Sequence, residues 1–388
     1  MTRPARRITA GSKKSFGMYE KALALEATGA DLIHMEFGRP CHDTPQLIKD
    51  AAIRALQDGH VHYSDMRGEA PLREALAAKL NEFNAMTVTA DDVLVTNGLT
   101  HASFAAIMAV VDPGDEVILL EPYYPQHVGK IELAGGTVVL APLDAAADFG
   151  INADLIAAKI TPKTRAIVLI NPANPTGRIY TRAELEALAD LAIRHDLIVI
   201  SDEVYEHITY GGTHISIAAL PGMAERTISL FAFTKAYAMD GWRLGYAVAA
   251  PNLVEAMLKI TANDVTHVNA FIQYGALAAI TDGEAAMQAM VDADRVKRDI
   301  VVSALNQMPG ITCPAPEGTI YAFPDISGTG MGAQALADAI LEHAHVVVEA
   351  GSFYGPVGNN HLRVCFGSES TPRIEEGMAR MARFLNTL

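Results

Sequence analysis

Cysteine is scarce in this sequence, and long apolar runs are missing. The 388 residues include three cysteines, Cys41, Cys313 and Cys365, which lie far apart and form no Cys-x-x-Cys pair. That spacing excludes a disulfide framework and favours a reducing compartment. No run of about 18 apolar residues is present to span a membrane, and the basic N-terminal stretch lacks the apolar segment of a secretory signal. We therefore expect a cytoplasmic protein without a membrane partner.

Positive charge is also in short supply. The chain carries 30 Lys and Arg against 45 Asp and Glu, which gives a formal net charge of −15. An acidic surface repels the phosphate backbone of nucleic acids, so nucleic acid is excluded as the main partner. A small anionic ligand is still compatible with the sequence, because one local cation can outweigh the net charge.

Hydrophobic residues are plentiful, at 50% of the chain, and they fall in short runs between helical segments. Runs such as TRAIVLI and DLIVISDE alternate with amphipathic helical segments such as 45–58 and 70–83. Short β-rich runs separated by helices need crossover connections, which predicts an α/β fold with a mostly parallel sheet. We assign 46–274 to this large domain, and 1–45 together with 275–388 to a smaller α+β domain.

Unusual polar sequence follows four of the predicted strands. The four motifs are TNGLTHA (96–102), NPANPTG (171–177), SDEVY (201–205) and TKAYAMDGWR (234–243). Ligands of open parallel sheets bind beyond the carboxyl ends of the strands. The recurrence of such motifs at strand ends therefore predicts one binding site that they share.

Most of these motifs also have a structural interpretation when taken alone. Asp202 could be a helix N-cap or part of an ion pair, NPANPTG could be a turn cluster, and Gly98 could begin a capped turn. In the functional interpretation, Asn174 points its amide into the site. The free N–H groups of the helix that follows Gly98 then bind a phosphate.

Lys235 and Arg243 lie in apolar sequence surroundings, FAFTKAYAMDGWRLGY. The structural alternative is a pair of cations that reach the surface along their apolar stems. A buried lysine with a lowered pKa can instead form a Schiff base with a carbonyl, and Arg243 offers a fork for a phosphate. Pyridoxal phosphate has an aldehyde for Lys235, a phosphate for Arg243 and a basic ring nitrogen for Asp202.

In their order along the chain, and with a late LRVCF segment, these motifs resemble the class I and II aminotransferases of fold type I, the aspartate aminotransferase superfamily. The resemblance extends from FGRPCHDTP to HLRVCFG. It implies a pyridoxal phosphate-dependent enzyme whose large domain holds a seven-stranded, mostly parallel sheet sandwiched by helices. It also implies a homodimer.

The resemblance implies roles at the centre of the site. Lys235 would hold the cofactor covalently and then move the proton of the substrate Cα, while Asp202 would keep the ring nitrogen protonated. His127 would support Asp202. Arg363 would clamp the substrate α-carboxylate as a bidentate fork, with the Gly38 backbone nearby.

Further positions match the family's cofactor contacts. By this resemblance, Tyr205, which we count as catalytic, and Asn174, which also contacts the substrate, would hydrogen-bond the ring hydroxyl. Tyr124 would stack on the ring, and Tyr63 would reach the phosphate of the neighbouring subunit. The implied cofactor-binding set is Leu99, Thr100, Tyr124, Asn174, Asp202, Tyr205, Thr234, Lys235, Arg243 and Tyr63.

Some positions depart from the family pattern. Ala232 stands where the family often has a serine that binds phosphate, so one phosphate contact is missing or replaced. Asp240 replaces a threonine before GWR, and Arg39 and Cys41 replace the more usual acidic residues of their loop. These changes leave the cofactor set intact and bear on phosphate affinity and substrate choice.

His60 and His62 raise the question of a metal, since alternate residues of a strand share a face. No third ligand is evident in the sequence, and the role implied for Tyr63 accounts for this stretch. We therefore expect no metal.

The implied reaction is a ping-pong transfer of an amino group from an L-amino acid to a 2-oxo acid. One alternative is another reaction at the same site, that of a β-lyase, decarboxylase or oxidase, since fold and cofactor do not fix the reaction type. A second alternative is a non-catalytic module that binds pyridoxal phosphate. Formation of a 2-oxo acid, with conversion of the cofactor to its amine form, distinguishes the transaminase from both.

Overall fold

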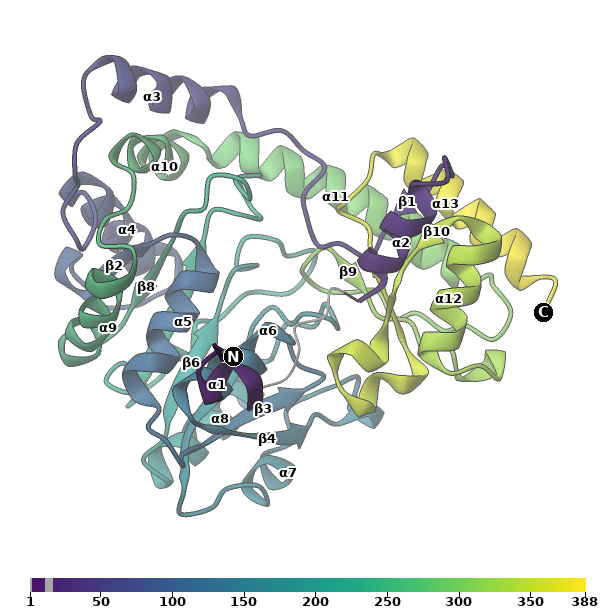
Figure 1. Cartoon of the computed structure of the whole chain (residues 1–388), viewed down its shortest axis with the longest axis horizontal. Helices are drawn as coiled ribbons and strands as arrows, with labels where there is room; N and C mark the ends of the chain where they lie inside the picture. The colour runs from purple at the N-terminus through teal and green to yellow at the C-terminus, as the bar shows by residue number, and fades with distance from the viewer. Residues whose placement is uncertain (1, 11–16) are drawn as a thin grey trace.

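A computed structural model describes residues 2–10 and 17–388, and seven strands within them form one sheet (Figure 1). The strand order is β2-β8-β7-β6-β5-β3-β4. β8 runs antiparallel to both of its neighbours, whereas the other pairs are parallel. The bounds are β2 (Val93–Thr96), β8 (Gly245–Val248), β7 (Thr227–Ala232), β6 (Ile198–Asp202), β5 (Thr164–Ile170), β3 (Glu116–Glu121) and β4 (Thr137–Pro142).

Helices cover both faces of this sheet, because the strands are apolar on both sides. In β5, Ala166 and Val168 belong to the core under α5, α6 and α9, whereas Ile167 and Leu169 belong to the core on the opposite face. The helices of this region are α3 (Gln46–Gln57), which packs on α10, and α4 (Ala70–Phe83), α5 (Leu99–Val110), α6 (Gln126–Ala134), α7 (Ala153–Ala157), α8 (Arg182–Arg194), α9 (Pro251–Asp264) and α10 (Ala270–Asp282). The predicted α/β class with a seven-stranded, mostly parallel sheet is confirmed.

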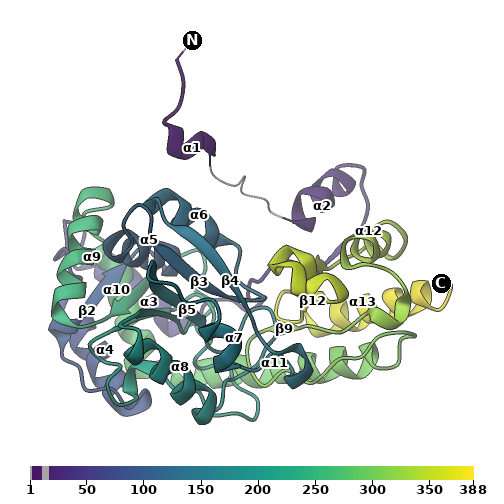
Figure 2. The same cartoon turned by 90° about the horizontal axis from the view of Figure 1, so that it is seen from below.

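Most of the remaining elements gather beside the sheet, whereas the short helix Arg6–Ala10 stands apart from that group and contacts α6 (Figures 1 and 2). Ile33 near the N-terminus pairs with Val346, so the two ends of the chain share a small parallel sheet. Three further strands follow the order β11-β12-β9. The bounds are β1 (Ile33–His34), β9 (Tyr321–Ala322), β10 (Val346–Val347), β11 (Glu349–Ala350), β12 (Leu362–Cys365), α1 (Arg6–Ala10), α2 (Met18–Glu26), α11 (Glu284–Leu305), α12 (Ala333–Ala344) and α13 (Thr371–Leu385).

The division into two domains stays a prediction. Residue 275, its predicted boundary, lies inside α10, which packs against α3. The long helix α11 then leads from the sheet to the group of elements around α12 and α13 (Figure 2). Among the described helices, none combines the length and the apolar character needed to cross a bilayer.

Buried charges fix the loop that follows β6. Glu206 accepts a hydrogen bond from Asn84 Nδ2 at 2.8 Å and forms an ion pair with Lys79 of α4. Lys79 Nζ also donates to Asn84 Oδ1 at 2.9 Å. Burial raises the pKa of Glu206, but the Lys79 ammonium outweighs this effect, and the pKa lies below its ordinary value. The pair therefore ties α4 to the segment 203–206.

Replacing Lys79 by Met tests this tie. The change leaves the Glu206 carboxylate buried without its cation, so we expect the free energy of unfolding in urea to fall by roughly 3 kcal/mol. The control is Glu255→Gln, which removes the exposed partner of Arg67 and should change it by less than about 1 kcal/mol. Equal effects of the two variants would contradict a structural role for the buried pair.

Candidate active site

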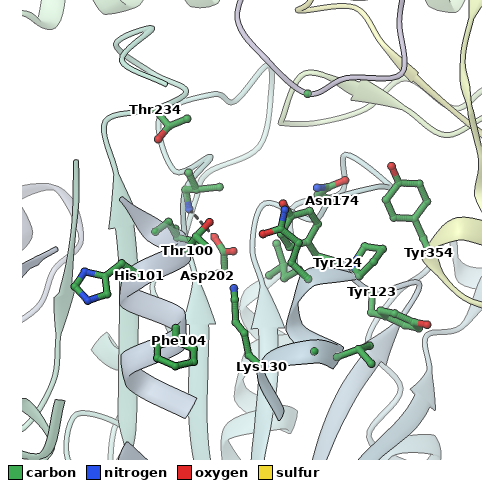
Figure 3. A pocket seen from close by; sticks show the side chains of 18 of the residues that line it. Thr100, His101, Phe104, Tyr123, Tyr124, Lys130, Asn174, Asp202, Thr234 and Tyr354 are labelled. Carbon is green, nitrogen blue, oxygen red and sulfur yellow. Dashed lines mark hydrogen bonds between the residues drawn. The ribbon is translucent and has the colours of Figure 1, made fainter. Parts of the chain in front are cut away.

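A cavity of about 1100 Å³ opens at the carboxyl ends of β5, β6 and β7 (Figure 3). It brings together residues from all four motifs that follow the strands, and it extends to β11 and β12. The predicted site residues that line it are Gly38, Leu99, Thr100, Tyr124, Asn174, Asp202, Tyr205, Thr234, Lys235, Arg243 and Arg363.

Lys235 lies in the cavity wall just after β7. Its Nζ donates a hydrogen bond to the carbonyl oxygen of Gly38. Burial of the amine lowers the pKa of Lys235 to about 8, because the charged form loses water. A substantial fraction of this amine is therefore neutral near pH 8, which is the form that attacks a carbonyl or accepts a proton.

Asp202 ends β6 and is 3% exposed. Its Oδ1 accepts a hydrogen bond from the Val204 amide at 3.2 Å, and its Oδ2 lies 3.9 Å from His127 Nε2. Burial raises the pKa of Asp202 to about 6. Burial also lowers the pKa of His127 far below its ordinary value, so this ring is neutral beside the carboxylate.

Arg363 reaches the cavity from β12. Its Nη1 donates to Asn174 Oδ1 at 3.1 Å, and its Nη2 donates to the Glu36 carbonyl oxygen. The guanidinium lies over the Tyr321 ring, 4.3 Å from the ring centroid, and the Tyr321 hydroxyl is 2.7 Å from that of Tyr205. Arg363 thus offers a fixed planar fork for a carboxylate.

Arg243 and the start of α5 form a second cationic region. α5 begins after Gly98, whose φ of 78° is unfavourable for other residues. A Cβ on Gly98 would lie 2.6 Å from Arg243 Nη2, so the glycine lets the guanidinium approach the helix. The free N–H groups of Leu99 and Thr100 and the guanidinium together suit a phosphate. Arg243 is exposed to the cavity rather than enclosed by its apolar neighbours.

Two predicted residues lie outside the lining of this cavity. The first is His127, which lies behind Asp202. The ring of Tyr124 meets the His127 ring edge-on, with 5.7 Å between the ring centroids. Tyr63 is 87% exposed and stacks on His267 at 4.7 Å. It therefore does not reach this chain's own cavity.

The stretch with His60 and His62 is not a strand, so the two side chains do not share a sheet face. His60 instead packs on Tyr274, with 4.1 Å between ring centroids. In 2–10 and 17–388, no group of three or more His, Cys, Asp or Glu side chains could hold a metal ion.

The cavity also contains residues that the sequence analysis missed. Tyr321 and Tyr354 enclose Arg363 between their rings, and nothing in their local sequence indicates it. Lys130 lines the cavity from α6. Its position three residues after His127 was an available signal, because residues i and i+3 share a helix face.

The aminotransferase class I and II family matches residues 30–380. The chain is also 39% identical over 359 residues to an aspartate aminotransferase of Musicola paradisiaca, which covers 92% of this chain and 90% of that protein. The chain belongs to the class I and II aminotransferases. The predicted enzyme class is thereby confirmed.

Other relatives of this aminotransferase differ in the substrates they are named for. The arginine–pyruvate transaminase of Pseudomonas aeruginosa is 37% identical over 358 residues, covering 92% of this chain and 91% of that protein. A single mutant of the Thermus thermophilus aspartate aminotransferase aligns with a TM-score of 0.93 at 35% identity, over 99% of this chain and 100% of that one. Members of this family depend on pyridoxal phosphate.

The depressed pKa of Lys235 can be measured on the cofactor-free aminotransferase. With a limiting amount of an amine-acylating reagent, only neutral amines react, so labelling of Lys235 should reach half of its maximum near pH 8. Exposed lysines in the same digest serve as the control and should titrate at about 10.4. Identical labelling curves for Lys235 and the exposed lysines would show that burial does not shift this amine.

Proposed function

We propose that the chain binds pyridoxal phosphate in this cavity and transfers an amino group from an L-amino acid to a 2-oxo acid in two half-reactions. The observation that carries the proposal is the Lys235 amine, with its pKa near 8, in one cavity with Asp202 and Arg363. A covalent handle, a partner for the ring nitrogen and a clamp for an α-carboxylate are what this chemistry requires.

The cavity has a complement for each group of the cofactor. Lys235 suits the aldehyde, and Asp202 suits the ring nitrogen, with the neutral His127 supporting it. Arg243 and the start of α5 suit the phosphate, and they come within reach of each other through Gly98. Four further residues line the cavity. In the proposal, Tyr205 and Asn174 would contact the ring hydroxyl, Tyr124 the ring face, and Thr234 would lie beside the lysine.

Bound pyridoxal phosphate supplies an electron sink for the charge left when the substrate Cα loses its proton. The protein's own groups do the rest. Arg363 binds the substrate α-carboxylate as a fork and so fixes the Cα near Lys235. The Lys235 amine takes the Cα proton, and the ammonium so formed would deliver it to the carbon that carried the cofactor's aldehyde; a pKa near the working pH suits both steps.

The direct test is chemical trapping on the lysine. After addition of pyridoxal phosphate and borohydride, mass spectrometry should find the added mass on Lys235. Lys235→Ala should lose the adduct and all measurable turnover, whereas Lys159→Ala, an exposed control, should keep both. The first donors to assay are aspartate, arginine and aromatic amino acids, after the relatives' names.

The products decide between this proposal and its alternatives. A 2-oxo acid, with the cofactor left in its amine form, is expected. Pyruvate with ammonia, or hydrogen peroxide, would instead indicate a lyase or an oxidase. Cofactor binding without turnover of any donor would contradict an enzymatic role.

We further propose that two copies pair and that Tyr63 of each completes the phosphate site of the other. Tyr63 is exposed and is not among the residues that line its own cavity. Other large apolar side chains on and after α3 are exposed as well, and association commonly buries such residues. They are Ile53, Leu56, Val61 and Met66.

Mixed dimers test this pairing. Tyr63→Ala removes a hydrogen bond to a charged group, so pyridoxal phosphate should bind about tenfold more weakly. In a dimer of one Lys235→Ala chain and one Tyr63→Ala chain, one site regains both residues. Spectroscopic titration should then find wild-type affinity at that site, while each variant alone serves as the control. A fully active monomer in sedimentation would refute the proposal.

A further inference from the structure

Lys130 is a buried cation in the wall of the candidate active site. It lies on α6, one turn after His127, and is 7% exposed. Its Nζ donates to Ser103 Oγ at 2.6 Å, and Ser103 Oγ donates to the Thr100 carbonyl oxygen at 3.1 Å. Figure 3 shows the Lys130 side chain extending toward Asp202. Lys130 is thus attached to the first turn of α5 and directed at the carboxylate that ends β6.

The positive charge of Lys130 lowers the pKa of Asp202, against the larger effect of burial, because an opposite charge nearby favours the ionised form of a buried carboxyl group. Asp202 is the acidic side chain toward which Lys130 extends. Each of the two groups therefore stabilises the charged form of the other. A surface lysine that reaches water along its stem would have neither the burial nor this direction.

Several other groups face Asp202, and none replaces Lys130. His127 is neutral, because burial and the nearby Lys130 charge both lower its pKa. Lys235 uses its amine in the chemistry proposed above, so its charge is not constant. The titratable groups facing Asp202 from the packed elements are His127 and Lys130 of α6, Tyr124 before it, Glu203 and Tyr205 after β6, Lys235 after β7, and Tyr321 of β9.

We propose that Lys130 is a positioning residue whose fixed positive charge keeps Asp202 ionised and so holds the shared proton on the cofactor's ring nitrogen. The part of this inference that concerns the ring nitrogen rests on the proposed function, whereas the part that concerns the ionisation of Asp202 does not. Asp202 would share one proton with the ring nitrogen of the bound cofactor, and a cation that lowers the proton affinity of the carboxylate would favour the nitrogen. Lys130 thereby strengthens the electron sink by acting through Asp202.

The first test uses the cofactor-free protein and therefore does not depend on the proposed function. A carboxyl group whose pKa is raised by folding binds its proton more tightly in the folded chain. Stability then falls as the pH rises from the unfolded pKa to the folded one. For wild type, the contribution of Asp202 to this fall ends near pH 6. Lys130→Met should raise the pH at which this fall in stability ends by about one unit, which corresponds to a tenfold change in the proton affinity of Asp202.

The measurement is the melting temperature of wild type and Lys130→Met between pH 5 and pH 8. We expect the difference in melting temperature between wild type and Lys130→Met to widen above pH 6. When Asp202→Asn is added to both proteins, this difference should be independent of pH. Lys130→Arg keeps the charge and should follow wild type, and Lys130→Gln serves as a second neutral variant. A gap that is constant with pH, or one whose pH dependence survives Asp202→Asn, overturns the inference.

The second test reads the ring proton directly. With ¹⁵N-labelled pyridoxal phosphate bound, the ring nitrogen of wild type should give the shift of a protonated ring, and that of Lys130→Met should move toward the unprotonated value. Ser103→Ala removes the hydrogen bond of Lys130 but keeps its charge, so it should move less. Equal shifts in wild type and Lys130→Met overturn the inference. If wild type fails to bind the cofactor, the proposed function and the inference about the ring nitrogen are both overturned. The first test, on the ionisation of Asp202, is not affected by that result.

Discussion

Two groups of opposite charge, Asp202 and Lys235, lie at the same edge of the central sheet, and the rest of the candidate site is arranged around them. β6 and β7 are parallel neighbours, so Asp202 and Lys235, at or just beyond their carboxyl ends, face the same cavity. Burial disfavours both ions, raising the pKa of Asp202 to about 6 and lowering that of Lys235 to about 8. The Lys130 charge partly offsets the effect of burial at Asp202, whereas the Arg363 charge lowers the pKa of Lys235 further. The proposed transamination depends on the same two groups.

The sequence was most informative where local pattern and topology agree. The apolar runs indicated the strands of the sheet, and the parallel arrangement carried the residues after them to one edge, which is why Asn174, Asp202 and Lys235 could be predicted together. Arg363 needed the resemblance to a family, because it comes from a separate sheet far along the chain. Tyr321 had no signal at all, since its role depends on packing against Arg363 rather than on its neighbours in sequence.

The distribution of charge explains how an acidic chain can accept anions. The whole sequence has 30 Lys and Arg against 45 Asp and Glu. Among the described residues that line the cavity, Lys and Arg are as numerous as Asp and Glu, with six of each. The excess of negative charge therefore lies elsewhere on the molecule. The proposed anionic cofactor and substrate would therefore meet a locally balanced site, in which Arg243 and Arg363 are the proposed contacts.

The reversed direction of β8 has a consequence for how the site can change. Ala232 pairs with Gly245, so the residues between them form a single closed connection from β7 to β8. That connection carries both Lys235 and Arg243. The proposed attachment point for an aldehyde, Lys235, and the proposed clamp for an anion, Arg243, therefore lie on one continuous segment of the chain. Insertions or deletions within it would misplace both at once, whereas the carboxylate fork of Arg363 can diverge on its own strand.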